Sequence, residues 1–435
     1  MSQSLAKDFN FRSLLKFAFP SIIMMIFMSL YSIVDGFFIA QYVDSMALSA
    51  ANIVYPAVGI MFGPGGSAVV AAKIGQGKLE EANRNFSALT LTTLIIGILG
   101  AVLGNLFCRQ ICSLLGATPV LMDYGTAYLR TILSFAPVCL LQALFQSFFV
   151  TAGRPGLGLS LTVSAGITNM LLDYLFVVPL HLGVAGAALA TGLGQCIPAV
   201  AGILYFTFAR KGLRFTRPEF SKGLLSTSCF NGSSEMVSNL SGSLVGILYN
   251  IQLMAIAREN GVSAYGVLMY VDFIFKAFFF GYSIAVTPVV GYHYGAQNHA
   301  ELKSLLRKSL IITVLASLLM TGGAIVLAGP IADLFVGYDA ALHDMTVNAL
   351  RIYSVSFLVF GFNIFGSAFF TGLNDGTDSA LISFLRTLVF QVAAILLLPR
   401  WLDINGIWLA VTAAESLTLL VTVSLLAAKR RKYHY

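Results

Sequence analysis

Four polar side chains interrupt long apolar stretches of the sequence and together offer the donor atoms of a cation site. They are Asp35, Asn169, Asp173 and Thr191. An ionisable group inside a membrane span costs about 2.5–3.5 kcal/mol on insertion scales, so such residues are candidates for function. Two carboxylates, an amide oxygen and a hydroxyl are hard ligands that suit Na⁺, and two neighbouring carboxylates can also share a proton. We therefore expect a site for a small cation, either H⁺ or Na⁺, and no other metal or cofactor.

The spacing of these residues supports one shared site. Asn169 and Asp173 are four residues apart and share a helix face. Asp35 and Asp173 come late in spans that run outward, and Thr191 comes early in a span that runs inward. All four are expected in the outer half of the membrane.

A second set of polar residues is predicted to line a substrate cleft. It consists of Tyr31, Gln142, Gln146, Glu235, Asp272 and Lys276. Asp272 and Lys276 are also four residues apart and can neutralise each other, so a structural role is an equal alternative for this pair. Arg386 is interpreted as a side chain that reaches the cytoplasmic face.

The composition of the sequence around these residues is that of a membrane protein. Hydrophobic residues make up 57% of the 435 residues and charged residues 10%, whereas soluble domains average about 25% charged residues. A membrane-crossing helix needs roughly 20 mostly apolar residues. Twelve such stretches are predicted at 14–41, 48–72, 86–107, 124–150, 158–180, 185–209, 223–257, 262–292, 309–329, 345–371, 379–399 and 404–428. The fold class is therefore an all-α integral membrane protein.

The positive charges predict its orientation. Lys and Arg gather before the first span, in the loops that follow spans two, four, six and eight, and in the tail from Lys429 to Lys432. By the positive-inside rule, both termini are cytoplasmic in a plasma (inner) membrane protein that crosses the bilayer many times. The net charge of +7 is then a feature of topology. Membrane lipid is the expected partner of these charges, and nucleic acid is not.

The two halves of the chain repeat each other at a constant offset of 220 residues. Matched positions include Gly75 and Gly295, Glu81 and Glu301, Ser134 and Ser354, and Thr151 and Thr371. This predicts a six-helix lobe at 1–209, a basic cytoplasmic linker at 210–222 and a second six-helix lobe at 223–435. Six spans per copy make the repeat parallel, and two such lobes can rock to expose a cleft to either side.

The ion-site residues do not follow the repeat. Asn169, Asp173 and Thr191 correspond to Val389, Ala393 and Val411. If packing alone required these polar groups, the second copy would be expected to keep some of them. Their loss favours a functional role, with a structural hydrogen-bond network as the alternative.

Several segments resemble the multidrug and toxic compound extrusion (MATE) family, and the likeness covers the whole chain. The segment Val34-Asp35-Gly36-Phe37-Phe38-Ile39 is similar to the acidic motif of the family's first span. Ile74-Gly75-Gln76-Gly77, followed by Glu81-Ala82, resembles its loop after span two. Asn169-x-x-x-Asp173, with Thr191 further on, resembles its amino-terminal cation site. Glu235 matches an acidic position in span seven, but the aspartate that some members carry in span ten is missing.

The resemblance implies antiport, in which inward H⁺ or Na⁺ drives export of cationic, amphipathic drugs. In that reading, Asp35, Asn169, Asp173 and Thr191 bind the ion. The alternatives are a flippase or exporter of a lipid-linked precursor or other metabolite, a membrane enzyme, and a channel. The sequence has no Walker motif and no catalytic constellation, which favours a secondary transporter that is not an enzyme. The resemblance implies organic cations as its substrates, and a monomer is expected because nothing in the repeat requires a partner chain.

Overall fold

The computed structural model describes residues 5–42, 62–114 and 122–435, and for residues 32–42 it describes the backbone alone. Within these ranges all regular secondary structure is helical. The sequence has long apolar segments whose backbone groups must be paired within the segment when no water is present, and a helix satisfies this requirement.

The first half of the chain forms the helices of the predicted spans one to six. They are α1 (Phe11–Tyr42), α4 (Pro64–Gly75), α5 (Leu79–Leu106), α6 (Cys108–Leu114), α7 (Met122–Ser134), α8 (Ala136–Thr151), α9 (Pro155–Val177) and α10 (Gly183–Phe208). Most of the predicted span 48–72 lies outside the described residues, and α4 is its end. The predicted span 124–150 is a bent pair, α7 and α8, with an angle of 55°.

The second half forms spans seven to twelve. Its helices are α11 (Leu224–Gly295), α12 (His299–Val326), α13 (Ala328–Val336), α14 (Ala340–Ser354), α15 (Phe357–Gly372), α16 (Gly376–Phe384), the π-helix η2 (Leu385–Phe390), α17 (Gln391–Leu397) and α18 (Pro399–Tyr433). The 72-residue α11 contains two predicted spans joined at Arg258, where the backbone is not helical.

Length and composition allow eight described helices to cross a membrane, or ten with each bent pair counted as one span. Counting α11 twice and adding the span that ends in α4 accounts for the twelve predicted spans. The loop between α10 and α11 contains the predicted linker 210–222, although the boundaries of the two lobes stay a prediction.

The repeat is visible in the backbone. The bend between α7 and α8 follows Ser134, and the 46° bend between α14 and α15 follows Ser354. Each serine donates a hydrogen bond from Oγ to the carbonyl four residues earlier, at 2.8 Å and 2.5 Å, a contact that often bends helices. Positive φ angles recur at the same offset, at Gly77 (78°) and Gln297 (53°).

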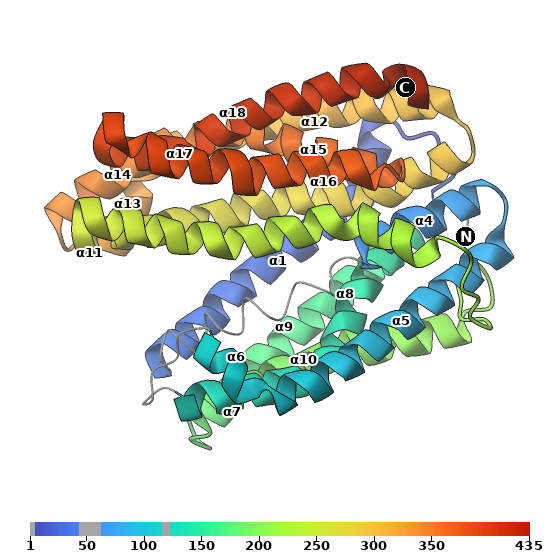
Figure 1. Ribbon diagram of the computed structural model, residues 1–435, viewed down its shortest axis with the longest axis horizontal. Helices are drawn as coiled ribbons and strands as arrows, with labels where there is room; N and C mark the ends of the chain where they lie inside the picture. The colour runs from blue at the N-terminus through green and yellow to red at the C-terminus, as the bar shows by residue number, and fades with distance from the viewer. Residues whose placement is uncertain (1–4, 43–61, 115–121) are drawn as a thin grey trace.

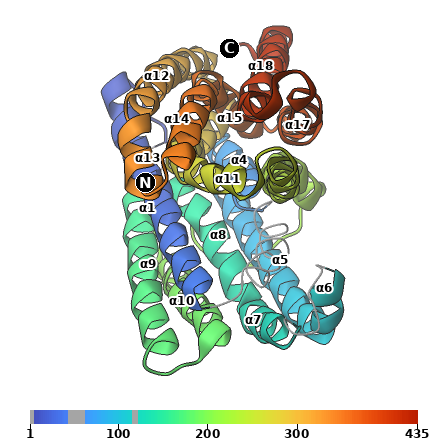
Figure 2. The ribbon, with the colours of Figure 1, turned by 90° about the vertical axis from the view of Figure 1, so that its left-hand side faces the viewer.

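Helices from the two halves gather in separate groups, blue to green and yellow to red (Figures 1 and 2). The groups meet near the termini and diverge toward the opposite end (Figure 1). At the meeting end, α4 crosses α11 through two glycines that the repeat relates. A Cβ on Gly75 would lie 2.0 Å from the carbonyl oxygen of Tyr292, and one on Gly295 would lie 2.0 Å from that of Ala72. Only glycine permits this approach.

The N-terminal segment adds a contact across the two halves at the same end. The backbone N–H of Phe9 donates to Glu301 Oε1 at 2.9 Å, and Lys308 Nζ donates to the carbonyl of Phe9. Phe9 itself is buried. The segment before α1 is thus attached to α12, in the other half of the chain.

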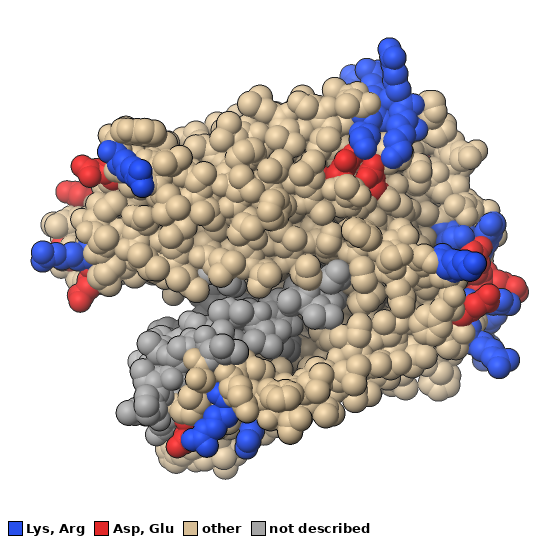
Figure 3. Space-filling view, viewed as in Figure 1, with Lys and Arg blue, Asp and Glu red and all other residues tan. Residues whose placement is uncertain are grey.

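The surface has the charge distribution of a membrane protein. On the face seen in Figure 3, Lys, Arg, Asp and Glu gather at the two ends of the molecule, with a broad uncharged band between them. Many large apolar side chains are exposed on α5, α9, α11 and α12, among them Leu106, Leu171, Ile251 and Leu319. Lipid accommodates such an apolar band at no cost in free energy, whereas exposure of the band to water would be unfavourable.

Candidate functional site

The first cluster of predicted site residues lies between α9 and α10. Asn169 and Asp173 are both buried on α9, with exposed fractions of 4% and 0%. Asn169 Nδ2 donates to Thr191 Oγ1 on α10 at 3.3 Å. Thr191 is half-buried, and its hydroxyl donates to the carbonyl of Ala187 at 3.1 Å. The structure therefore brings Asn169 and Thr191 into contact, with Asp173 one turn along the same face.

Glycines on α9 and α10 allow this cluster to form. A Cβ on Gly194 would lie 2.9 Å from the carbonyl oxygen of Ala165 and 3.1 Å from Asn169 Cβ. A Cβ on Gly166 would lie 2.5 Å from the ring of Phe27 and 3.3 Å from that of Tyr31, both on α1. Helices α1 and α10 thus pack closely on α9 on either side of Asn169.

The donor set fits a small hard cation or a proton. Asn169 Oδ1 is buried and accepts no hydrogen bond from the described residues, and a buried carbonyl without a partner is costly. The Thr191 hydroxyl donates to the carbonyl of Ala187 and accepts from Asn169 Nδ2, which leaves one lone pair for a cation. Asp35 belongs to α1, but its side chain lies outside the described residues. No group of three His, Cys, Asp or Glu that could hold a transition metal occurs in the described part of the chain.

The predicted cleft residues of the first half lie on α1 and α8. Gln142 and Gln146 are half-buried on α8, and Tyr31 is half-buried on α1. Gln146 Nε2 lies 2.9 Å from Met28 Sδ and 3.8 Å from Met25 Sδ. Gln146 thus makes a thioether contact from α8 to α1.

The predicted cleft residues of the second half belong to a different cluster. Asp272 and Lys276 on α11 form an ion pair, with 2.6 Å between Oδ2 and Nζ. The Tyr353 hydroxyl on α14 donates to Asp272 Oδ1 at 2.9 Å. Glu235, half-buried earlier in α11, has Arg386 as its electrostatic partner.

The interpretation of Arg386 as a residue that reaches the cytoplasmic face is wrong. Its side chain is 7% exposed, and Nε lies 3.1 Å from Glu415 Oε1 on α18. Asn363 Nδ2 donates to Glu415 Oε2 at 2.7 Å, and Thr422 Oγ1 donates to Asn363 Oδ1 at 2.8 Å. Arg386 lies in the π-helix η2, a feature often found at functional sites. The sequence analysis missed Glu415 and Asn363, although an acidic residue within the twelfth span was itself the signal.

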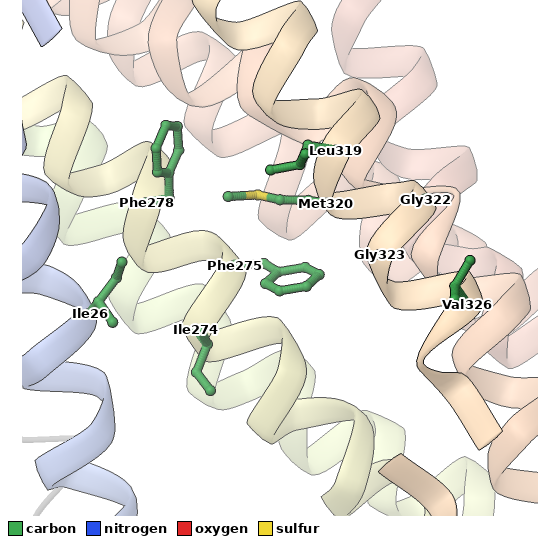
Figure 4. A pocket seen from close by; sticks show the side chains of 9 residues that line it. All are labelled: Ile26, Ile274, Phe275, Phe278, Leu319, Met320, Gly322, Gly323 and Val326. Carbon is green, nitrogen blue, oxygen red and sulfur yellow. The ribbon is translucent and has the colours of Figure 1, made fainter. Parts of the chain in front are cut away.

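A pocket of about 560 Å³ lies between α1, α11 and α12 (Figure 4). Its lining is apolar and contains Ile26, Ile274, Phe275, Phe278, Leu319, Met320, Gly322, Gly323 and Val326. Such a lining has no group that would hold an ion, so this pocket is not a candidate ion site.

A polytopic helical fold with two groups of six spans and buried polar clusters defines a membrane transporter. The family model MatE matches residues 20–175 and 236–396. The chain belongs to this family.

Relatives align over nearly the full length. The chain is 21% identical to the multidrug export protein MepA of Staphylococcus haemolyticus over 432 residues, which covers 97% of this chain and 94% of the relative. It is 22% identical to MepA of Staphylococcus saprophyticus, with coverage of 97% and 93%.

Solved structures share the fold. A crystal structure of MATE in complex with MaL6 superposes with a TM-score of 0.92 at 21% identity and covers 100% of this chain and 99% of the other. The outward-facing conformation of a multidrug resistance MATE family transporter gives a TM-score of 0.91 at 22% identity, with coverage of 99% and 98%. A transporter of the MOP superfamily from Pyrococcus furiosus gives 0.90 at 21% identity, with coverage of 100% and 98%.

Proposed function

We propose that this protein is a secondary antiporter that exports cationic, amphipathic compounds and is driven by an inward gradient of H⁺ or Na⁺. The observation that carries the proposal is the buried oxygen cluster of Asn169, Asp173 and Thr191. It belongs to one half of a protein whose two halves meet at one end and diverge at the other (Figure 1). Membership of the MatE family is consistent with this activity.

The substrate class follows from the chemistry of the polar residues and from the relatives. The MepA relatives are named multidrug export proteins. Half-buried Glu235 supplies negative charge, and Met25 and Met28 beside Gln146 supply polarizable, adaptable surface. An aromatic cation of low polarity suits such a surface.

The ion drives transport by binding the two arrangements of the lobes with different affinity. A ligand shifts such an equilibrium only by its differential affinity. In this proposal, Asp35 joins Asn169, Asp173 and Thr191 around the ion, and α1 and α10, which pack on α9 through Gly166 and Gly194, respond to its binding. That response favours the arrangement with weaker affinity for the drug.

With both termini in the cytoplasm, the end closed by Gly75 and Gly295 is the cytoplasmic end. In this proposal, the arrangement with its far end apart is the outward-open one, in which the drug leaves and the ion enters from outside. The plasma membrane, both cytoplasmic termini and the monomeric state are parts of this proposal.

Ethidium efflux from proteoliposomes tests the proposal, with a Na⁺ gradient and a pH gradient imposed separately. Wild type is expected to export ethidium under one of these gradients, and Asp35→Asn and Asp173→Asn are each expected to abolish that dependence. Folded wild-type protein that moves neither ethidium nor other cationic dyes would overturn the proposal and favour a lipid-linked precursor or another metabolite as the substrate.

A further inference from the structure

The buried carboxylates on α11 and α18 in the second half are each held by cations and donors of the protein itself. Asp272 is 4% exposed. One of its oxygens lies 2.6 Å from Lys276 Nζ, and the other accepts a hydrogen bond from the Tyr353 hydroxyl at 2.9 Å. An added cation would have to displace the ammonium.

Glu415 has the same kind of surroundings. Oε1 lies 3.1 Å from Arg386 Nε, and Oε2 accepts from Asn363 Nδ2 at 2.7 Å. The two cations also share one aromatic ring, because Lys276 Nζ lies 4.7 Å and Arg386 Cζ 5.0 Å from the centre of Phe360. A cation over an aromatic face is further stabilised. The second half thus contains two ion pairs around one ring, and Arg386 also faces the Glu235 carboxylate.

The first half differs. Its sequence contains no Lys or Arg between Lys16 and Lys73, nor within the predicted spans 158–180 and 185–209. The oxygen cluster of Asn169, Asp173 and Thr191 therefore has no Lys or Arg on its own two helices, while Asn169 Oδ1 accepts no hydrogen bond from the described residues. The ion pairs of the second half have no counterpart in the first half. At the offset of 220 residues, Asp272, Lys276, Arg386 and Glu415 correspond to Asn52, Pro56, Gly166 and Gln195.

We propose that the Lys276 ammonium is a built-in substitute for a monovalent cation at Asp272, and that it restricts the coupling ion to the first half. Lys276 keeps 24% of its side chain exposed, so the carboxylate is not sealed behind it. An ammonium carries the charge of Na⁺ or of a bound proton, and its tether makes its effective concentration at Asp272 very high. Lys276 is then the residue that sets the number of coupling ions, an inference that rests on the proposed antiport.

Ion binding to the purified full-length protein in lipid nanodiscs tests this inference without requiring transport. Lys276→Met is expected to gain one binding equivalent, seen either as radiolabelled sodium or as one extra protonated carboxylic acid in the infrared spectrum. Asp272→Asn added to Lys276→Met is expected to remove the gain. Lys303→Met, which changes an exposed lysine of α12, is the control and is expected to bind as wild type.

Two results would overturn the inference. One is a folded Lys276→Met protein whose sodium binding and carboxyl band both equal those of wild type. The other is a loss of one ion equivalent in the neutral double variant relative to wild type, because Asp272 would then bind an ion in the presence of Lys276. The double variant leaves no unpaired charge at this pair, so its ion binding can be compared with that of wild type even if Lys276→Met does not fold. Failure of ethidium efflux in wild type would affect the proposed function and leave these binding results unchanged.

Discussion

Replacement of Gly75 by alanine is expected to destabilise the arrangement of lobes seen in the structure. The new Cβ would lie 2.0 Å from the carbonyl oxygen of Tyr292 and 2.9 Å from the backbone nitrogen of Ala296. Both atoms belong to the backbone, so they cannot rotate away. To regain an ordinary contact of 3.4 Å, α4 and α11 would have to separate by about 1.4 Å.

Overpacking of this kind costs typically about 1–3 kcal/mol. The cost applies only while α4 and α11 are in contact, so the ratio of the two lobe arrangements should shift by roughly 5- to 150-fold. Because no comparable clash arises once the lobes separate at this end, the variant should favour the arrangement that is open near the termini.

Electron–electron distance measurements between spin labels check this prediction. Lys78→Cys and Lys303→Cys place labels on exposed side chains of the two halves near the closed end, in a background without the five native cysteines. Gly75→Ala should add a population with a longer distance. Gly100→Ala, in α5, is the matched control, because a Cβ there meets nothing within 4 Å. Identical distance distributions for Gly75→Ala and wild type would refute the reasoning.

Three further predictions concern stability. The hydrogen bond from Lys73 lowers the pKa of Glu81. The stability that it adds is complete above the unfolded pKa of about 4.3 and is lost as the pH falls through the lower folded pKa, so Glu81→Gln should flatten the acid side of a plot of Tm against pH. Phe86→Ala should cost about 3–5 kcal/mol and lower Tm, because the ring is fully buried against three other phenylalanines at 4.6–5.0 Å, and an unchanged Tm would contradict this packing. Arg386→Met should cost about 3–5 kcal/mol by leaving Glu415 buried and unpaired, while adding Glu415→Gln should restore most of the loss in thermal unfolding.

The fold could be predicted from the sequence because a lipid environment restricts which backbone conformations are possible. A segment of about 20 apolar residues must be a helix, and the offset of 220 residues paired Ser134 with Ser354 before their helices were seen to bend at the same place. The π-helix that contains Arg386 was not predictable, because its six residues include no glycine or proline to mark a change of helix type. The continuous α11 was divided correctly into two spans, although its backbone break is limited to Arg258.

The candidate ion site was predictable in part. Spacing placed Asn169 and Asp173 on one face, and the structure adds the contact with Thr191. The pairing of Arg386 with Glu415 could not be read from spacing, because they lie 29 positions apart in two different helices. Local sequence gives the depth of a residue along a span but not the direction in which its helix faces. For this reason Arg386 was assigned to the membrane surface and lies instead within the second half.

The exchange of ion for drug is the central claim, and the most direct test imposes a gradient of the drug alone. Proteoliposomes loaded with tetraphenylphosphonium, with no gradient of H⁺ or Na⁺ and the membrane potential clamped, are diluted into drug-free buffer while ion movement is followed. The account predicts that wild type takes up H⁺ or Na⁺ as the drug leaves, and that Asp173→Asn does not. Ion movement in the same direction as the drug, or drug efflux in wild type without any ion movement, would contradict it.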